Sequence, residues 1–217
     1  MTVRTACLLV LALVLPYASV HGQETADYRL YINVTWSAET HPLDFPMNPT
    51  FSHLIGATHS DRYSMFRDGE TGSSGLELIA ERGRVSIFQI ELEEADDREL
   101  IGTHFEGGEI KEIPGDATLS FSARADFPLL SFVTMIAPSP DWFTGVSGAS
   151  LHDGSQWVDQ LELPLWVWDA GTDSGDTYLA RNQDIQPQQS VRLSATPHFL
   201  DNRGLKRVGE VTIERIE

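Results

Sequence analysis

Residues 28–36 read Tyr-Arg-Leu-Tyr-Ile-Asn-Val-Thr-Trp, and their alternation decides the fold class of this chain. The even positions are all apolar or aromatic, whereas the odd positions are mostly polar. A two-residue period places successive side chains on opposite faces of a strand. The stretch therefore predicts a β-strand with one face against a core and the other toward solvent.

Similar alternation recurs at residues 117–124, 191–195 and 211–213. Residues 85–92 also predict a strand, with a slip of phase between Ile87 and Phe88 that suggests a bulge. A further segment, residues 129–137, is nearly all apolar and predicts a central strand covered on both faces. These segments make β-structure the dominant element of the chain.

Other segments predict one helix and one long loop. Ser74-Gly75-Leu76-Glu77 fits a capping box, and Gly83 fits the end of the helix. Residues 41–68 are rich in Pro, His and Ser and predict a long ordered loop, while the acid-rich residues 91–99 predict a solvated hairpin tip. With no repeats and no linker, we expect an all-β fold: one antiparallel β-sandwich of about eight strands with one short helix.

The first 22 residues have the layout of a secretory signal. Arg4 precedes the apolar residues 6–15, and small residues follow Pro16. We predict cleavage after Gly22, with Ala18 as the alternative, so that the single domain spans residues 23–217. An uncleaved anchor is the competing interpretation, but a membrane span needs about 20 apolar residues. The protein is expected to be secreted or periplasmic.

Charge and cysteine content narrow the function classes. The full chain has a formal net charge of −17, which opposes binding to nucleic acid and to an anionic membrane surface. Cys7, the only cysteine, lies within the predicted signal, so the mature chain has no disulfide. An exported domain without disulfides must be stabilised by its core or by a metal.

Two acidic segments, residues 138–145 and 168–175, each follow an apolar run and contain turn-forming residues. Asp169 and Asp173 are separated by a turn containing Gly171, which permits both carboxylates to point into one space. Strands 129–137, 144–151 and 156–163 would cross the sandwich in turn. The two crossings after Asp141 would bring Asp169 and Asp173 to the same end.

Three carboxylates in one place repel each other unless they are protonated or neutralised. Ca²⁺ takes about 6–8 oxygen ligands in flexible geometry, whereas Mg²⁺ demands a strict octahedron and zinc prefers nitrogen or sulfur. Asp141, Asp169 and Asp173 are therefore candidate calcium ligands. The alternative is a pair of acidic turns held by Asx hydrogen bonds.

The sequence resembles the spondin domain family of extracellular and exported proteins over roughly residues 28–195. The most specific stretches are Pro138-Ser139-Pro140-Asp141-Trp142 and Asp169-Ala170-Gly171-Thr172-Asp173-Ser174-Gly175. The resemblance implies a C2-like antiparallel β-sandwich with a calcium site, whose aspartates fall on Asp141, Asp169 and Asp173. Animal relatives join this domain to cysteine-rich modules and act in the matrix and in adhesion. This chain has no such modules and lacks the cysteines those relatives carry.

We therefore expect a calcium-binding extracellular recognition or adhesion module with a protein or glycan partner, and not an enzyme. One alternative is a purely structural domain in which calcium replaces disulfides. Another is a metal-dependent hydrolase with Asp141 or Asp173 as the base, but no His, Arg or Lys adjoins either segment.

The sequence also contains two groups that admit a second interpretation. His41, His53 and His59 match no common zinc spacing and are expected to hydrogen-bond the long loop. Four tryptophans are expected mainly in the core or as walls of the metal site, with a sugar-stacking platform as the alternative; they are Trp142, Trp157, Trp166 and Trp168.

Overall fold

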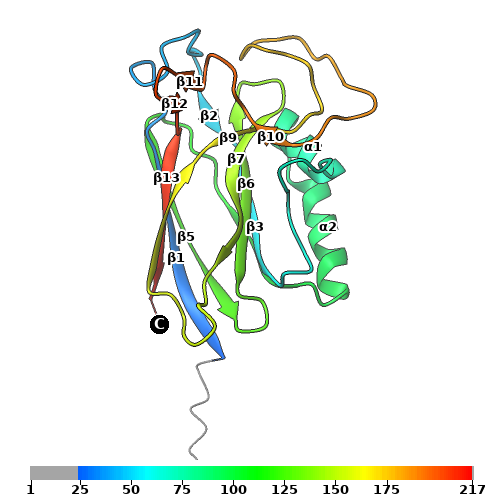
Figure 1. The fold of residues 1–217 in the computed structure, drawn as a ribbon, viewed down its shortest axis with the longest axis vertical. Coiled ribbons are helices and arrows are strands. Elements are labelled where there is room, and N and C mark those ends of the chain that lie inside the picture. The colour runs from blue at the N-terminus through cyan, green and yellow to red at the C-terminus, as the bar shows by residue number, and fades with distance from the viewer. Residues whose placement is uncertain (1–23, 217) are drawn as a thin grey trace, which may run out of the picture.

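The computed structural model describes residues 24–216 as two facing antiparallel sheets with two helices against the outer face of one sheet (Figure 1). The predicted signal and Cys7 lie outside the described residues. The strands are β1 (Thr25–Val34), β2 (Thr50–Phe51), β3 (Leu54–His59), β4 (Ile101–Gly107), β5 (Gly115–Arg124), β6 (Leu129–Ala137), β7 (Trp142–Ser150), β8 (Gln160–Leu165), β9 (Val167–Asp169), β10 (Arg192–Leu193), β11 (Leu200–Asp201), β12 (Gly204–Leu205) and β13 (Gly209–Arg215). The helices are α1 (Ser74–Arg82) and α2 (Ser86–Asp97).

One sheet has four strands in the order β5-β1-β13-β8. The other has the order β10-β9-β7-β6-β3-β4, with β2 paired to β6. Within residues 24–216, eight strands have six or more residues: β1, β3, β4, β5, β6, β7, β8 and β13. The predicted all-β antiparallel sandwich of about eight strands is therefore confirmed.

The core between the sheets follows the alternation of β1. Tyr28, Leu30, Ile32 and Val34 are buried, whereas the residues between them are exposed. These four side chains belong to one apolar cluster with residues of both sheets. The cluster accounts for the predicted two-residue period, because only one face of β1 contacts the core.

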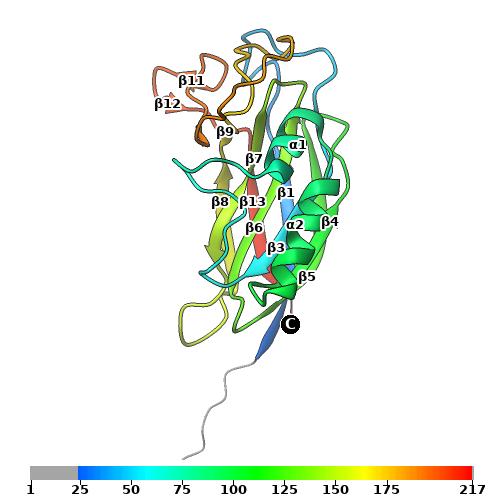
Figure 2. The same ribbon diagram turned by 90° about the vertical axis from the view of Figure 1, so that its right-hand side faces the viewer.

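A second core lies between the larger sheet and the helices (Figure 2). Phe132 of β6 packs between the two sheets, while its neighbour Val133 packs under the helices. This confirms the prediction that the apolar run at 129–137 is covered on both faces. No helix in the described residues is long and apolar enough to cross a membrane.

The strand predicted at residues 85–92 is wrong, because most of this segment belongs to α2. Phe88, Leu92 and Ala95 follow a spacing of four and three residues and are buried on one helical face. Ile90, between Phe88 and Leu92, is 51% exposed, which a strand with Leu92 inward would not produce. The part of the chain from residue 24 to 216 therefore has two helices rather than one, and the acid-rich segment after Glu91 is not a hairpin tip.

The predicted helix is confirmed as α1, but its N-cap is Ser73 and not Ser74 of the predicted capping box. The Oγ of Ser73 accepts a hydrogen bond from Leu76 N at 3.1 Å. The carboxylate of Glu91 on α2 also accepts bonds from Ser73 Oγ at 2.7 Å and Gly75 N at 2.8 Å. An acid at a helix N-terminus is favourable because it meets unpaired N–H groups and the positive end of the helix dipole. Gly83 ends the helix with φ of 63°, as predicted.

The loop predicted at residues 41–68 contains the central strand β3, so that prediction is wrong over its middle part. All six residues of β3 are buried, because the facing sheet covers one side and the helices cover the other. A strand covered on both faces lacks the alternation of polar and apolar residues by which a strand is recognised in a sequence. His59, the last residue of β3, forms a hydrogen bond between its Nε2 and Ser131 Oγ of β6 at 2.7 Å. On its other edge, β3 pairs with β4.

Candidate metal centre

The two acidic segments lie against each other at one end of the larger sheet. β7 pairs with β9 in an antiparallel ladder that places Trp142 opposite Asp169. The N–H of Ala170 also donates to the carbonyl of Asp141 at 3.1 Å. Between these elements the chain passes through β8 in the smaller sheet, then crosses to the larger sheet at β9. The pairing of β7 with β9 brings Asp141 to the segment that follows Asp169.

Asp141 is fully buried, and its carboxylate points into the loop that follows Asp169 in the second acidic segment. Its Oδ2 accepts hydrogen bonds from the N–H of Thr172 at 2.8 Å and of Asp173 at 3.1 Å. The hydroxyl of Thr172 is 3.4 Å from the same oxygen. The other carboxylate oxygen, Oδ1, is buried without a hydrogen-bond partner in the described structure. A buried carboxylate oxygen without a partner requires an explanation, because its desolvation is not compensated.

The surroundings of Asp141 disfavour its negative charge. Burial and, to a lesser extent, the nearby charge of Asp169 raise the pKa of its carboxyl to about 6, although the hydrogen bonds from the N–H groups of Asp173 and Thr172 act in the opposite direction. Removing a carboxylate from water penalises its charged form unless a cation or enough donors compensate. A cation at Oδ1 would supply that compensation.

Asp169 is mostly buried and holds two partners. Its Oδ1 accepts from the N–H of Gly171 at 2.9 Å, and its Oδ2 is 3.1 Å from the guanidinium of Arg192. Arg192 lies opposite Asp169 in the β9–β10 pair. No basic residue adjoins either acidic segment along the sequence, but Arg192 lies beside the second segment in space. No sequence signal identifies Arg192, because strand pairing alone brings it there.

Asp173 is buried and uses both carboxylate oxygens within its own loop. Oδ1 accepts from the N–H of Gly175 and Oδ2 from the N–H of Gln183, each at 2.7 Å. Asp169 and Asp173 therefore form the Asx-type hydrogen bonds expected under the alternative interpretation. Gly171 adopts φ of 75°, and a Cβ at this position would lie 2.4 Å from Gln189 O. The tight path expected at this glycine is confirmed.

No three His, Cys, Asp or Glu side chains in residues 24–216 are grouped closely enough to hold a metal ion. This includes the three candidate histidines, of which His53 is exposed and His41 and His59 are buried at different places. The three aspartates share one hydrogen-bonded loop network, with Asp141 at its centre. Their carboxylates do not form a closed set of metal ligands in this structure.

Glu81 of α1 is a second buried acid beside this network. Its side chain is 8% exposed, and its Oε1 has no hydrogen-bond partner in the described structure. Burial raises the pKa of its carboxyl, while a hydrogen bond involving Thr172 lowers it. Thr172 thus lies between the carboxylates of Asp141 and Glu81. Sequence reasoning assigned no role to Glu81, because its helical position does not reveal its contact with the second acidic segment.

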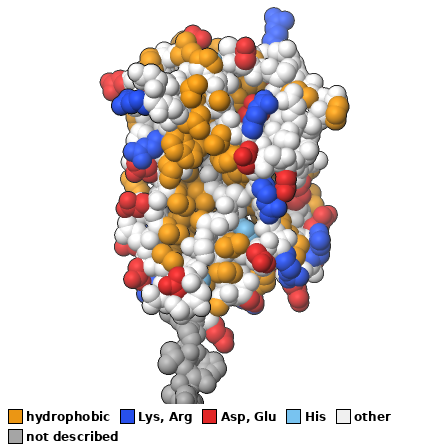
Figure 3. All heavy atoms as spheres, in the orientation of Figure 1, with side chains coloured by type: hydrophobic (Ala, Val, Ile, Leu, Met, Phe, Trp, Pro, Cys, Tyr) orange, Lys and Arg blue, Asp and Glu red, His pale blue; other side chains and the backbone are white. Residues whose placement is uncertain are grey.

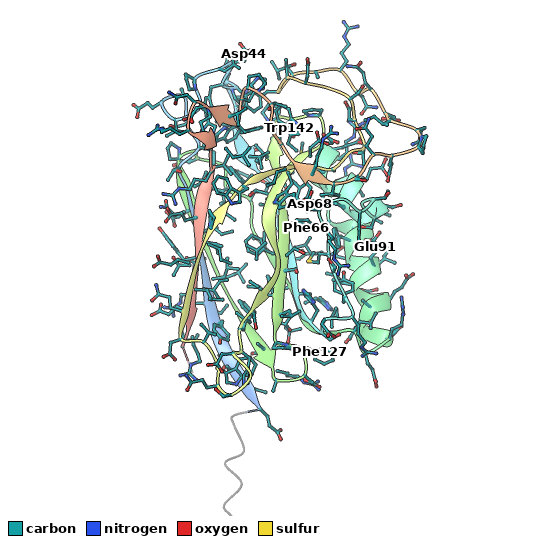
Figure 4. The ribbon with its side chains drawn as sticks, in the orientation of Figure 1. Asp44, Phe66, Asp68, Glu91, Phe127 and Trp142 are labelled. Atoms are coloured by element: carbon teal, nitrogen blue, oxygen red, sulfur yellow. The ribbon has the colours of Figure 1, made fainter. Side chains whose placement is uncertain are left out.

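The tryptophan that follows Asp141 in sequence belongs to an aromatic cluster in the core between the sheets. Trp142, labelled in Figure 4, is fully buried and packs edge-to-face on Tyr178 and Phe199, with ring centroids 5.4 and 5.1 Å apart. Trp157 is also buried, whereas Trp166 and Trp168 are only partly covered. The expected core role therefore applies to Trp142 and Trp157, and in part to Trp168, which packs against the second core.

The Spondin_N family model matches residues 26–203 of the chain. Spondin-1 of Gallus gallus is 35% identical over 205 residues, which cover 88% of this chain and 26% of the relative. Spondin-2 of Homo sapiens is 33% identical over 204 residues, which cover 88% of this chain and 62% of the relative. The chain thus spans about a quarter of Spondin-1 and less than two thirds of Spondin-2. The match covers both acidic segments and the larger sheet that carries them, and the chain belongs to the spondin N-terminal domain family.

Proposed function

We propose that this protein is an exported calcium-binding recognition domain, in which Ca²⁺ is bound by Asp141, Asp169 and Asp173. The observation that carries the proposal is the fully buried carboxylate of Asp141, whose Oδ1 has no partner in the described structure. A hard cation is the group that best compensates a buried carboxylate with acidic neighbours. Family membership supports the same assignment, because the resemblance to the spondin domain implies a calcium site at these residues.

The hydrogen bonds of the three acids are compatible with an ion. Each carboxylate oxygen has two lone pairs, so an oxygen that accepts one N–H retains capacity for a metal. Arg192, the cation beside Asp169, has a side chain that is 56% exposed, so it can turn toward solvent when calcium arrives. Backbone carbonyls and water would complete the coordination, as is usual for calcium. Binding would require the carboxylates to draw closer than they lie in this structure.

In this proposal the ion fastens the loop before β7 to the loop after β9. The fastened end of the sandwich then presents a rigid surface to an extracellular protein or glycan. The proposal assigns binding rather than catalysis to this end. A purely structural role for calcium differs from it only in predicting no partner whose binding depends on the ion.

Calorimetry with calcium tests the site. A ligand at about 100 times its dissociation constant stabilises the folded state by about 2.7 kcal/mol, which is roughly 5–10 °C for a domain of this size. We expect calcium to produce such a shift in melting temperature, and magnesium a smaller one. Asp141→Asn and Asp173→Asn should abolish the calcium shift, since each removes a proposed anionic ligand.

Asp153→Asn provides the matched control. The Oδ1 of Asp153 accepts bonds from Ser155 N and Gln156 N in an exposed turn, so this variant changes a similar Asx turn outside the network. It should keep the full calcium shift. An unchanged wild-type melting curve in millimolar calcium would refute the calcium site. Calcium-dependent capture of a matrix protein or glycan would then separate recognition from a structural role.

A further inference from the structure

A groove of about 840 Å³ lies beside the β11–β12 hairpin, where β8 ends and the chain crosses to β9. Its lining combines the aromatic residue Trp166 with three basic residues, which are Arg203, Lys206 and Arg207. Figure 3 shows a band of hydrophobic side chains down the visible side of the molecule, with basic side chains beside it near the end at which Figure 1 places the hairpin. The groove is separate from the acidic network, and none of the proposed calcium ligands lines it.

Lys206 is a partly buried cation without a carboxylate partner. No Asp or Glu oxygen in the described residues lies within ion-pair distance of its ammonium, which is instead 3.4 Å from the carbonyl of Thr40. Burial lowers the pKa of Lys206, while the more distant Asp201 raises it. A partly desolvated cation without a counter-anion favours an anionic ligand, because that ligand restores the lost compensation.

Two arginines extend the positive charge along the groove. The side chain of Arg203 is 88% exposed and lies 3.7 Å from Asp201, and that of Arg207 is 55% exposed and pairs with Glu210. Among the lining residues, three cations meet two acids, Glu39 and Asp201, so the lining has a charge of +1. This sign is opposite to the net charge of −17 of the whole chain. Because Arg203 lies beside Asp201 and Arg207 pairs with Glu210, the cation most available to an anionic ligand is Lys206.

Trp166 adds an apolar surface of a particular kind. It is only partly covered, unlike the fully buried Trp142, and it lines the groove from the crossing between the sheets. Its carbonyl accepts a bond from Thr144 Oγ1 at 2.7 Å, which fixes the backbone at this position. A flat aromatic ring next to polar and charged groups suits a sugar ring, which has an apolar face and polar edges.

We propose that this groove binds a segment of an acidic polysaccharide, with a sugar ring on Trp166 and a sulfate or carboxylate at Lys206. The basic rim at Arg203 and Arg207 would contact the next charged groups along the polymer. The inference goes beyond calcium binding by naming the ligand class and the surface that takes it.

Titration of the mature protein with a heparin octasaccharide, at low ionic strength and in the presence of calcium, tests the groove. Lys206→Gln should weaken binding by about tenfold or more, because a hydrogen bond to a charged group is lost. Lys111→Gln is the matched control, since Lys111 is 75% exposed and pairs with Glu109 outside the groove. The control should change the affinity by less than about twofold.

A second variant tests the aromatic contact. Trp166→Leu should also weaken binding by about tenfold, because it removes the aromatic stacking surface while keeping an apolar side chain. If this variant does not fold, the comparison of the two lysine variants still tests whether the groove binds the saccharide. Both lysine side chains are exposed or partly exposed, so these variants are expected to fold.

Three results would overturn the proposal. They are no binding of the octasaccharide by the wild type, an equal loss in the two lysine variants, and equal affinity for a single-stranded DNA of the same charge. The last result would mean that charge alone is recognised. Because no groove residue is a proposed calcium ligand, failed saccharide binding leaves the calcium shift unaffected. A missing calcium shift likewise leaves the saccharide titration interpretable.

Discussion

At the scale of single residues, a comparison of Gly171 with Gly148 distinguishes the cost of backbone strain from the cost of a steric clash. Both have positive φ, at 75° and 71°, but a Cβ on Gly171 would meet Gln189 O at 2.4 Å, whereas one on Gly148 would meet nothing within 4 Å. We expect Gly148→Ala to lower the free energy of unfolding by about 1–2 kcal/mol through strain alone. Gly171→Ala should cost clearly more, since the backbone of the loop must also move.

Urea unfolding of the two alanine variants measures this difference. Gly171→Ala should in addition weaken the calcium shift, because the displaced loop carries the N–H groups that bond Asp141. Equal destabilisation by the two substitutions would show that the loop at Gly171 can move away from the added Cβ without lowering the free energy of unfolding.

His41 makes the stability of the fold depend on pH. It is 1% exposed, and burial lowers the pKa of its ring to about 4, with Lys206 acting in the same direction. The unfolded ring has a pKa of about 6.5, so unfolding takes up a proton between these two values. This contribution to stability is fully present above pH 6.5 and is lost as the pH falls toward 4, by about 2 kcal/mol between pH 7.5 and 5.

Urea unfolding of wild type and His41→Gln at these two pH values isolates the contribution of this ring. The variant should lose less stability on acidification than the wild type. His53→Gln is the control, because His53 has a side chain that is 51% exposed. An identical pH dependence in wild type and His41→Gln would contradict the assignment.

At the scale of elements, α2 offers a test that a strand would fail. Leu92 is fully buried and Ile90 is 51% exposed, although the two residues are two apart and would share a face in a strand. Leu92→Ala should therefore lower the free energy of unfolding by about 2–5 kcal/mol, and Ile90→Ala by less than about 1 kcal/mol. Comparable losses in the two variants, measured by urea unfolding, would favour a strand.

At the scale of the whole molecule, the net charge of −17 sets the response to salt. Like charges destabilise the compact state, and salt screens them over about 10 Å at 0.1 M. We expect the melting temperature to rise by a few degrees from low to moderate sodium chloride in the absence of calcium. A falling melting temperature would mean that surface ion pairs outweigh the general repulsion.

Sequence patterns predicted strands of two kinds: β1, which has one solvent-exposed face, and the longer β6, which is covered on both faces. β1 and the two-sided β6 were predicted, because alternation and an unbroken apolar run have direct structural meanings. β3 was missed, since burial on both faces leaves so short a strand without a recognisable pattern. α2 was wrongly predicted as a strand, since Phe88, Ile90 and Leu92 are spaced two residues apart, as in a strand. Only the structure shows that Ile90 is exposed while the other two are buried.

The sequence by itself determined the strand pattern of β1 and β6, the presence of α1 with its end at Gly83, and the two acidic segments, because each depends on neighbours along the chain. Only the tertiary structure decided that Arg192 pairs with Asp169, that Glu81 lies beside Thr172, and that Lys206 shares a groove with Trp166. These contacts join residues far apart in sequence. They arise from strand pairing and from packing between layers, which no local pattern of residues encodes.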